Sequence, residues 1–143
     1  MAWVLYDKFR KAQFDQVDGV DLDTDTLKIM LTTSVYSPAQ ATDGYKSDVS
    51  NEVSGTNYTA AGAALSGKTV TLASGTVTFD ANDVTWLQSA TGFSNARKAV
   101  LYKDTGVATT SRLIAYADFG ADKGNVSGDL TLQMDAAGII TSP

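Results

Sequence analysis

The first apolar positions of the chain follow a helical spacing. In VLYDKFRKAQF, residues 4–14, Leu5, Phe9 and Ala12 recur at i, i+4 and i+7. This spacing places side chains on one face of an α-helix. We therefore expect a short amphipathic helix over residues 4–14.

Further along the chain the period of the pattern changes to two. In LKIMLTT, residues 27–33, every second residue from Leu27 to Leu31 is aliphatic, as in a β-strand. Residues 34–66 are then dominated by Ser, Thr, Ala, Gly, Asp and Asn, most of which favour turns. We expect a long loop-rich excursion over 34–66, with one short strand near 48–53.

From Lys68 onward, short β-type runs alternate with turn residues. The runs are KTVTL, GTVTF, DVTWL, KAVLYK, RLIAYADF, DLTLQM and GIIT. Many strands at short spacing, without a second helical pattern, are typical of antiparallel sandwiches, jelly rolls and small barrels. A length of 143 residues is enough for one ordinary core. The pattern predicts a mainly β fold, an antiparallel β-sandwich or jelly-roll-like single domain over residues 1–143 with a short N-terminal helix.

Composition and charge narrow the classes of partner. The chain has 43% hydrophobic and 19% charged residues, as globular proteins do. Its net charge is −5 at pH 7 and its basic residues are scattered, so it offers no basic surface to nucleic acid. No apolar stretch approaches the length of a membrane-spanning helix. We expect neither nucleic acid nor a membrane as a partner, and no secretion signal.

The sequence contains no Cys and no His. This excludes disulfides, thiolate chemistry and the Ser–His–Asp and Cys–His mechanisms. Most zinc sites need the same two residue types. No other group of acid, base and nucleophile stands out, so we expect no catalytic residues, no cofactor and no enzymatic activity.

Residues 62–69, GAALSGKT, match the pattern of a nucleotide-binding P-loop. A P-loop lies between a buried strand and the N-terminus of a helix, whose free N–H groups hold phosphate. Here the preceding residues are polar, and the following VTLASGTVTF is β-type. We therefore expect a turn through Ser66–Gly67 and no phosphate site.

Asp21, Asp23 and Asp25 are the candidate calcium ligands of the chain. Their spacing matches the first half of an EF-hand loop, but Thr26 stands where that loop needs Gly, and Thr32 where it needs Glu. In an extended chain the three carboxylates would share one face, which is one alternative. The other is a solvated connection with Asx turns. Our expectation is that no metal is bound.

The aromatic residues divide between core and surface. Trp86 and Phe79 alternate with polar neighbours in β-type runs, so we expect both in the core. Trp3 and Phe14 fall on the charged side of the expected helix, so they either contact another protein or pack against loops of this chain. The candidates for contact with another protein are Trp3, Tyr6, Phe14, Tyr45 and Tyr58.

Several phrases are spread along almost the whole chain. They are LYDKF at 5–9, VDLDTDTLKIML at 20–31, SDVSNEVSG at 47–55, LSGKTVT at 65–71, FDANDVTW at 79–86, AVLYKDTG at 99–106, RLIAYADFG at 112–120 and GIIT at 138–141. Together they resemble a family of small virion proteins of tailed bacteriophages, commonly identified as head decoration or cement proteins. The resemblance implies a β-rich fold, self-association and docking on a repeating protein lattice. It brings no catalytic or metal residue.

The resemblance leads us to expect a non-enzymatic decoration protein on the outer capsid surface, made in the host cytoplasm. It would bind the lattice of the major capsid protein as a small homo-oligomer, a dimer or a trimer. One alternative is an accessory or fibre-attachment subunit of the tail or neck. Another is a carbohydrate-binding β-sandwich displayed on the virion, using exposed aromatic rings and the Asp21–Asp25 cluster with calcium.

Overall fold

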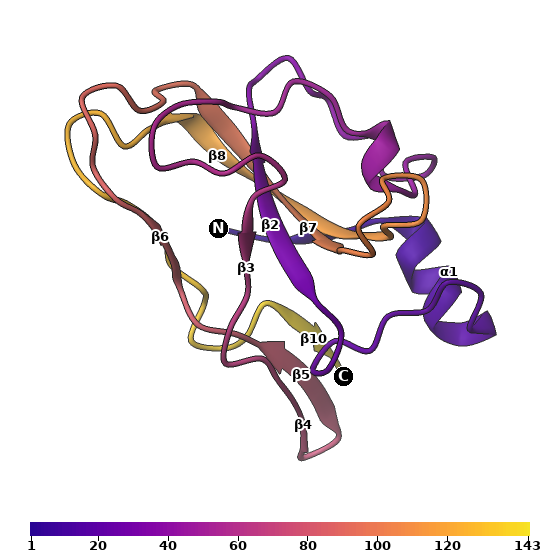
Figure 1. Cartoon of the computed structure of the whole chain (residues 1–143). Helices are drawn as coiled ribbons and strands as arrows, with labels where there is room; N and C mark the ends of the chain where they lie inside the picture. The colour runs from indigo at the N-terminus through magenta and orange to yellow at the C-terminus, as the bar shows by residue number, and fades with distance from the viewer.

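The computed structural model describes residues 1–143, which form a mainly β structure with antiparallel sheets and one α-helix (Figure 1). The strands are β1 Val4–Leu5, β2 Leu27–Thr32, β3 Ala63–Ala64, β4 Thr69–Ala73, β5 Thr76–Asp80, β6 Val84–Trp86, β7 Ala96–Lys103, β8 Leu113–Lys123, β9 Leu130–Leu132 and β10 Ile140–Ser142. The helices are α1 Asp7–Asp15 and a short 3-10 helix, η1 Lys46–Asp48. All seven β-type runs predicted from Lys68 onward form strands, so this part of the pattern is confirmed.

The strands form three antiparallel sheets. The largest has the order β1-β8-β7-β2-β3, the second has the order β10-β5-β4, and the third pairs β6 with β9. In Figure 1 the long strands β2, β7 and β8 cross the upper part of the molecule, and the β4–β5 hairpin extends from its lower end. The hairpin therefore projects beyond the largest sheet.

The central strands of the largest sheet are buried on both faces. Residues 99–102 of β7 are all completely inaccessible to solvent, and successive residues of a strand point to opposite faces. In β2, Met30 lies on the face opposite Leu27, and both are buried. One core of 25 buried residues includes side chains from all three sheets. Phe79 and Trp86 are among them, as predicted.

The N-terminal helix is shorter than the predicted 4–14. Residues 4–5 pair antiparallel with β8 as β1, and α1 begins after Tyr6. The prediction failed at this end because the backbone of residues 4–5 extends the sheet beside β8, which side-chain spacing does not reveal. Phe9 and Ala12 are buried on the inner face of α1, as predicted.

Residues 34–66 are loop-rich, but the strand expected near 48–53 is wrong. The segment contains η1 and β3, and near 48–53 only an isolated bridge between Glu52 and Thr32 has strand geometry. The Asp48 carboxylate accepts hydrogen bonds from two preceding backbone N–H groups, at 2.8 and 3.0 Å. A side chain that binds the local backbone in this way competes with ladder formation.

Asn125 connects three loops from a completely buried position. Its Oδ1 accepts a hydrogen bond from the N–H of Phe93 at 2.9 Å. Its Nδ2 donates to the carbonyl oxygens of Thr56 and Leu87 at 3.1 and 2.8 Å. Gly92 leaves room for this amide, because an added Cβ there would lie 1.9 Å from Asn125 Oδ1. One side chain thus ties the long excursion to the segment between β6 and β7.

We predict that Asn125→Ala lowers the free energy of unfolding by about 3 kcal/mol, because it leaves one N–H and two carbonyl groups without their partner. Chemical denaturation measures the change. Asn95→Ala is the matched control, since Asn95 is exposed and its loss should stay within about 0.5 kcal/mol. Equal effects of the two substitutions would contradict the anchoring role.

Candidate functional site

The five aromatic candidates for protein contact do not gather on one surface. Tyr6 is completely buried. Tyr45, Tyr58 and Trp3 are half-buried, and Trp3 packs against the core. Phe14 differs from the others because its side chain is 92% exposed.

Tyr6 anchors the loop that follows β2. Its hydroxyl lies 2.9 Å from Tyr36 Oη, and Tyr36 donates its own proton to the Asp43 carboxylate at 2.9 Å, so Tyr6 is the donor of the first bond. Burial raises the pKa of Tyr6 far above its usual range, and it raises the pKa of Tyr36 as well. The contact prediction for Tyr6 is wrong, because the spacing of the helix does not indicate the distant loop that covers this side chain.

Tyr58 also has a structural role. Its hydroxyl donates to the Glu52 carboxylate at 2.8 Å and accepts from the backbone N–H of Leu31 at 3.0 Å. Its ring stacks on Trp86, with centroids 6.4 Å apart, and forms a T-shaped contact with the Phe93 ring, with centroids 5.7 Å apart. Burial raises the pKa of Tyr58. These contacts bind the excursion to β2. They involve both the ring and the hydroxyl of Tyr58.

Tyr45 belongs to a charged cluster beside α1. The Arg112 guanidinium lies 4.4 Å from the centroid of its ring, and the Tyr45 hydroxyl bonds to both Arg112 and Asp18. The hydrogen bond to Asp18 raises the pKa of Tyr45. Tyr45 and Arg112, together with Lys8 and Lys11, line a cavity of about 290 Å³. Tyr45 is therefore engaged within the chain through both its ring and its hydroxyl.

An apolar groove of about 460 Å³ lies between α1 and the β4–β5 hairpin. We call it the hairpin groove, and its apolar lining is Leu5, Phe9, Phe14, Leu22, Val70, Val77, Phe79 and Ile140. Beside it on β4, Leu72 is 73% exposed. Neighbouring aliphatic and aromatic side chains in contact with water are typical of surfaces that bind another protein. The hairpin groove is the candidate functional site of this chain.

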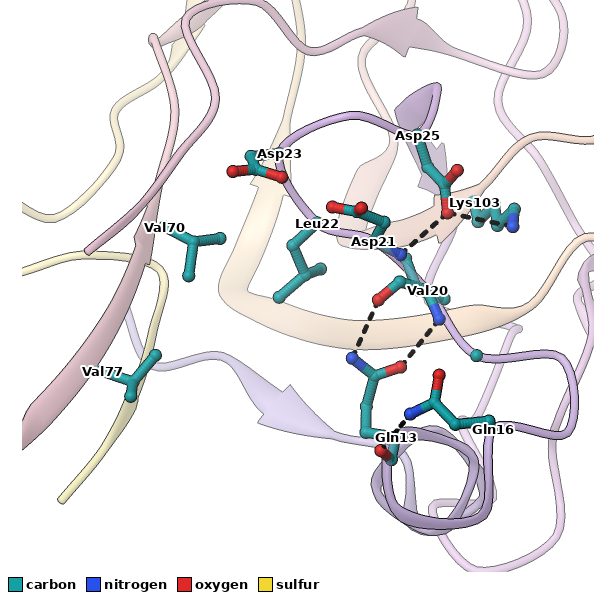
Figure 2. Close-up of a pocket in the computed structure, with 11 residues that line it drawn as sticks. Gln13, Gln16, Val20, Asp21, Leu22, Asp23, Asp25, Val70, Val77 and Lys103 are labelled. Atoms are coloured by element: carbon teal, nitrogen blue, oxygen red, sulfur yellow. Dashed lines mark hydrogen bonds and ion pairs between the residues drawn. The ribbon is translucent and has the colours of Figure 1, made fainter. Parts of the chain in front are cut away.

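A polar cavity of about 610 Å³ adjoins the hairpin groove, and Leu22, Val70 and Val77 line both. Figure 2 shows the side-chain amide of Gln13, on α1, bonded to both the N–H and the C=O of Val20. The Gln13 amide accepts from the Val20 N–H at 2.8 Å and donates to the Val20 carbonyl oxygen at 2.9 Å. These two bonds fix Val20, which precedes Asp21, Asp23 and Asp25, against the helix.

The three candidate calcium ligands do not converge in this cavity. The Asp25 carboxylate accepts from the Asp21 N–H at 2.8 Å and pairs with Lys103 at 2.9 Å (Figure 2). A hydrogen bond between the Asp21 and Asp23 carboxyl groups lowers the pKa of Asp21 and raises that of Asp23. The segment forms a turn, so the extended geometry of the calcium alternative is wrong. No group of three or more acidic side chains is placed to hold a metal.

The segment that matches a P-loop has a different geometry. Thr69 begins β4, as the alternation predicted, so a strand follows the lysine where a P-loop has a helix. Lys68 donates to the carbonyl oxygen of Asp25. Gly62 packs on β2, where an added Cβ would lie 2.0 Å from the carbonyl oxygen of Ile29. Gly62 is therefore accounted for by its close packing on β2, and Lys68 by its hydrogen bond within the chain, without a bound phosphate.

Sequence reasoning missed Val70, Leu72 and Val77 as surface residues. The runs KTVTL and GTVTF alternate threonine with apolar residues, which correctly predicted strands. The same alternation indicates an apolar face, but it does not say whether another element covers that face. The face stays partly exposed because the hairpin projects beyond the largest sheet.

Comparison with known proteins adds no family to this arrangement. No protein-family model, no curated protein and no solved structure matches the chain. Neither of its helices has the length and apolar character needed to cross a membrane.

We predict that the free energy of unfolding falls steeply above about pH 10, the ordinary pKa of tyrosine. Burial raises the pKa of Tyr6, Tyr36, Tyr58 and Tyr102. Groups whose pKa is raised by folding contribute stability that is complete below the unfolded pKa and is lost as the pH rises through the folded one. Denaturation at a series of pH values, with tyrosinate absorbance, measures the effect. Ionisation of all six tyrosines near pH 10 before unfolding would contradict it.

Proposed function

We propose that this chain is a non-enzymatic structural protein of a tailed-bacteriophage virion. In this proposal it is a decoration protein that binds the outer surface of the assembled capsid. Its partners are the lattice of the major capsid protein and further copies of itself. The proposal includes the finer fold class, a β-sandwich or jelly roll, which is supported by separate antiparallel sheets that contribute to one core.

The exposed apolar side chains around the hairpin groove carry the proposal. Phe14, on the α1 side, and Leu72, on β4, are both largely exposed, and the groove between these two elements is mostly apolar. Each Å² of apolar surface removed from water contributes about 25 cal/mol, so a partner that covers this region gains affinity. Aromatic side chains at the centre of an interface are frequent hot spots. The region therefore has the chemistry of a protein-binding surface.

The mechanism is thermodynamic. A protein that binds the assembled shell, and not its separate subunits, stabilises the shell by mass action. Copies that dock at neighbouring positions of the lattice and also contact one another add avidity. Such a role requires complementary surfaces and needs no reacting group.

The copy number distinguishes a capsid location from a tail or neck location. A decoration protein approaches the major capsid protein in stoichiometry, whereas a tail or neck subunit is present in a few symmetric rings. Densitometry of purified particles of the parent virus measures this ratio. A count of only one ring per particle would contradict the capsid location.

We predict that Phe14→Ser weakens binding to shells that lack the protein by about 30-fold, because loss of a hot-spot ring costs about 2 kcal/mol. Cosedimentation with such shells measures the affinity. Val35→Ser is the matched control. Val35 is 71% exposed, but it follows the C-terminal end of β2 and does not line the hairpin groove. Equal binding by both variants would exclude the hairpin groove as the contact. Failure of the unmodified chain to bind shells or to raise their thermal disruption temperature would contradict the decoration role.

A further inference from the structure

β4 is the longest of the strands that lie at the edge of a sheet. The other edge strands, β1, β3, β6, β9 and β10, have two or three residues each. β4 has five, and all are exposed. Most natural edges are protected by a charged residue, a proline or a bulge, whereas TVTLA contains neither of these residue types and pairs with β5 without a register shift. Another strand can therefore add to this edge.

The backbone groups that face outward from β4 belong to Val70 and Leu72. Val70 stands opposite Phe79, whose carbonyl oxygen accepts a hydrogen bond from the N–H of Ile139 on the β10 side. Directly opposed residues of an antiparallel pair either bond to each other or both point away. Val70 therefore directs its N–H and C=O to the open side, and Leu72, two residues on, does the same. The edge offers two donors and two acceptors.

The two faces of the hairpin differ in chemistry. Its apolar face carries Val70, Leu72, Val77 and Phe79. Its other face carries four threonines together with Ala73 and, opposite Thr69, Asp80. The turn residues Ser74 and Gly75 both have positive φ, 51° and 78°, as a type I′ hairpin requires. A strand that adds to β4 must therefore match an apolar face and a threonine face at once.

We propose that β4 pairs antiparallel with β4 of a second copy of this chain, about a two-fold axis through Thr71. In this register Val70 of each copy lies opposite Leu72 of the other, and the two Thr71 residues face each other. The outward groups of Val70 and Leu72 then form four hydrogen bonds across the seam. The inference rests on the self-association contained in the proposed function and names the surface that provides it.

The register also aligns the side chains of the two copies. The row formed by Phe79 and Val70 in one copy continues into Leu72 and Val77 of the other, so the exposed Leu72 gains an apolar neighbour. On the opposite face Thr71 meets Thr71. Aliphatic pairs and threonine pairs of this kind stabilise antiparallel sheets.

A second copy fits this edge because the seam is uncharged and self-complementary. Along the chain, the charged residue nearest β4 is Lys68, which lies opposite Ser74 of the other copy. Asp80 lies on β5, one strand away from the seam, so two chains of net charge −5 meet without like charges directly opposed. Five residues a side are fewer than the roughly 20–30 of a stable interface. We therefore expect a dissociation constant in the micromolar range or weaker in solution. On a lattice that holds copies side by side, the effective affinity rises.

Single cysteines test the register, because the chain has no cysteine of its own. In a non-hydrogen-bonded antiparallel pair the Cα atoms lie about 4.5 Å apart, within the range that a disulfide spans. Thr71→Cys should therefore give a covalent dimer under mild oxidation. Thr69→Cys and Ala73→Cys should each remain monomeric alone, because each cysteine lies about 13 Å from its own copy. A mixture of these two variants should form the heterodimer.

Other patterns of cross-linking would overturn the proposal. A bond between positions 69 and 71, or between 71 and 73, would mean that β4 pairs in another register. Absence of any cross-link faster than random collision would mean that β4 does not pair with itself. All three positions are exposed in the monomer, so substitution there should leave folding intact, and circular dichroism verifies this.

Sedimentation equilibrium supplies a second measurement that needs no cysteine. Leu72→Lys should raise the dissociation constant of the dimer at least tenfold, because a lysine on a strand edge opposes pairing. Val35→Lys is the matched control, with nearly the same exposure in the monomer. A monomer at every accessible concentration, or equal effects of the two lysines, would overturn the pairing. These experiments use the purified chain without capsids, so lattice binding is judged separately by cosedimentation.

Discussion

Burial of β7 on both faces is the constraint on which the rest of this structure depends. Residues 99–102 have no solvent contact on either side, so each face of the sheet must be covered by another part of a short chain. One small helix cannot cover both faces. The smaller sheets and the loops must therefore contribute side chains to the same core.

Loops can cover a sheet only if their polar groups find partners, because an unpaired buried donor or acceptor costs more than a made hydrogen bond gains. This protein meets the condition with a few side chains that reach between distant segments. Tyr6 holds the loop after β2, Tyr58 holds the excursion to β2, and Asn125 connects the excursion to the segment between β6 and β7. Polar and aromatic side chains of a kind often found at protein surfaces thus hold distant segments of this chain together.

The β4–β5 hairpin, unlike the central strands of the largest sheet, is only partly covered by other segments. Its base contributes Phe79 to the core, but its tip extends beyond the largest sheet (Figure 1), and Leu72 has no internal partner to shield it. The same extension leaves the edge of β4 open and creates the groove beside α1. One geometric fact, the position of the hairpin, thus produces both the apolar surface of the proposed lattice contact and the edge of the proposed dimer.

Local signals in the sequence determined much of this fold. The seven strands from Lys68 onward and the buried face of α1 at Phe9 and Ala12 follow from period and turn residues, which act over a few neighbours. The tertiary structure decided what depends on distant partners. Residues 4–5 became a strand because β8 lies beside them. The Asp25 carboxylate pairs with Lys103 and with the backbone N–H of Asp21, and not with the carboxyl groups of Asp21 and Asp23. The apolar face of the hairpin stayed partly exposed because no other segment reaches it. No pattern along the chain carries such information, since it arises only when remote segments meet.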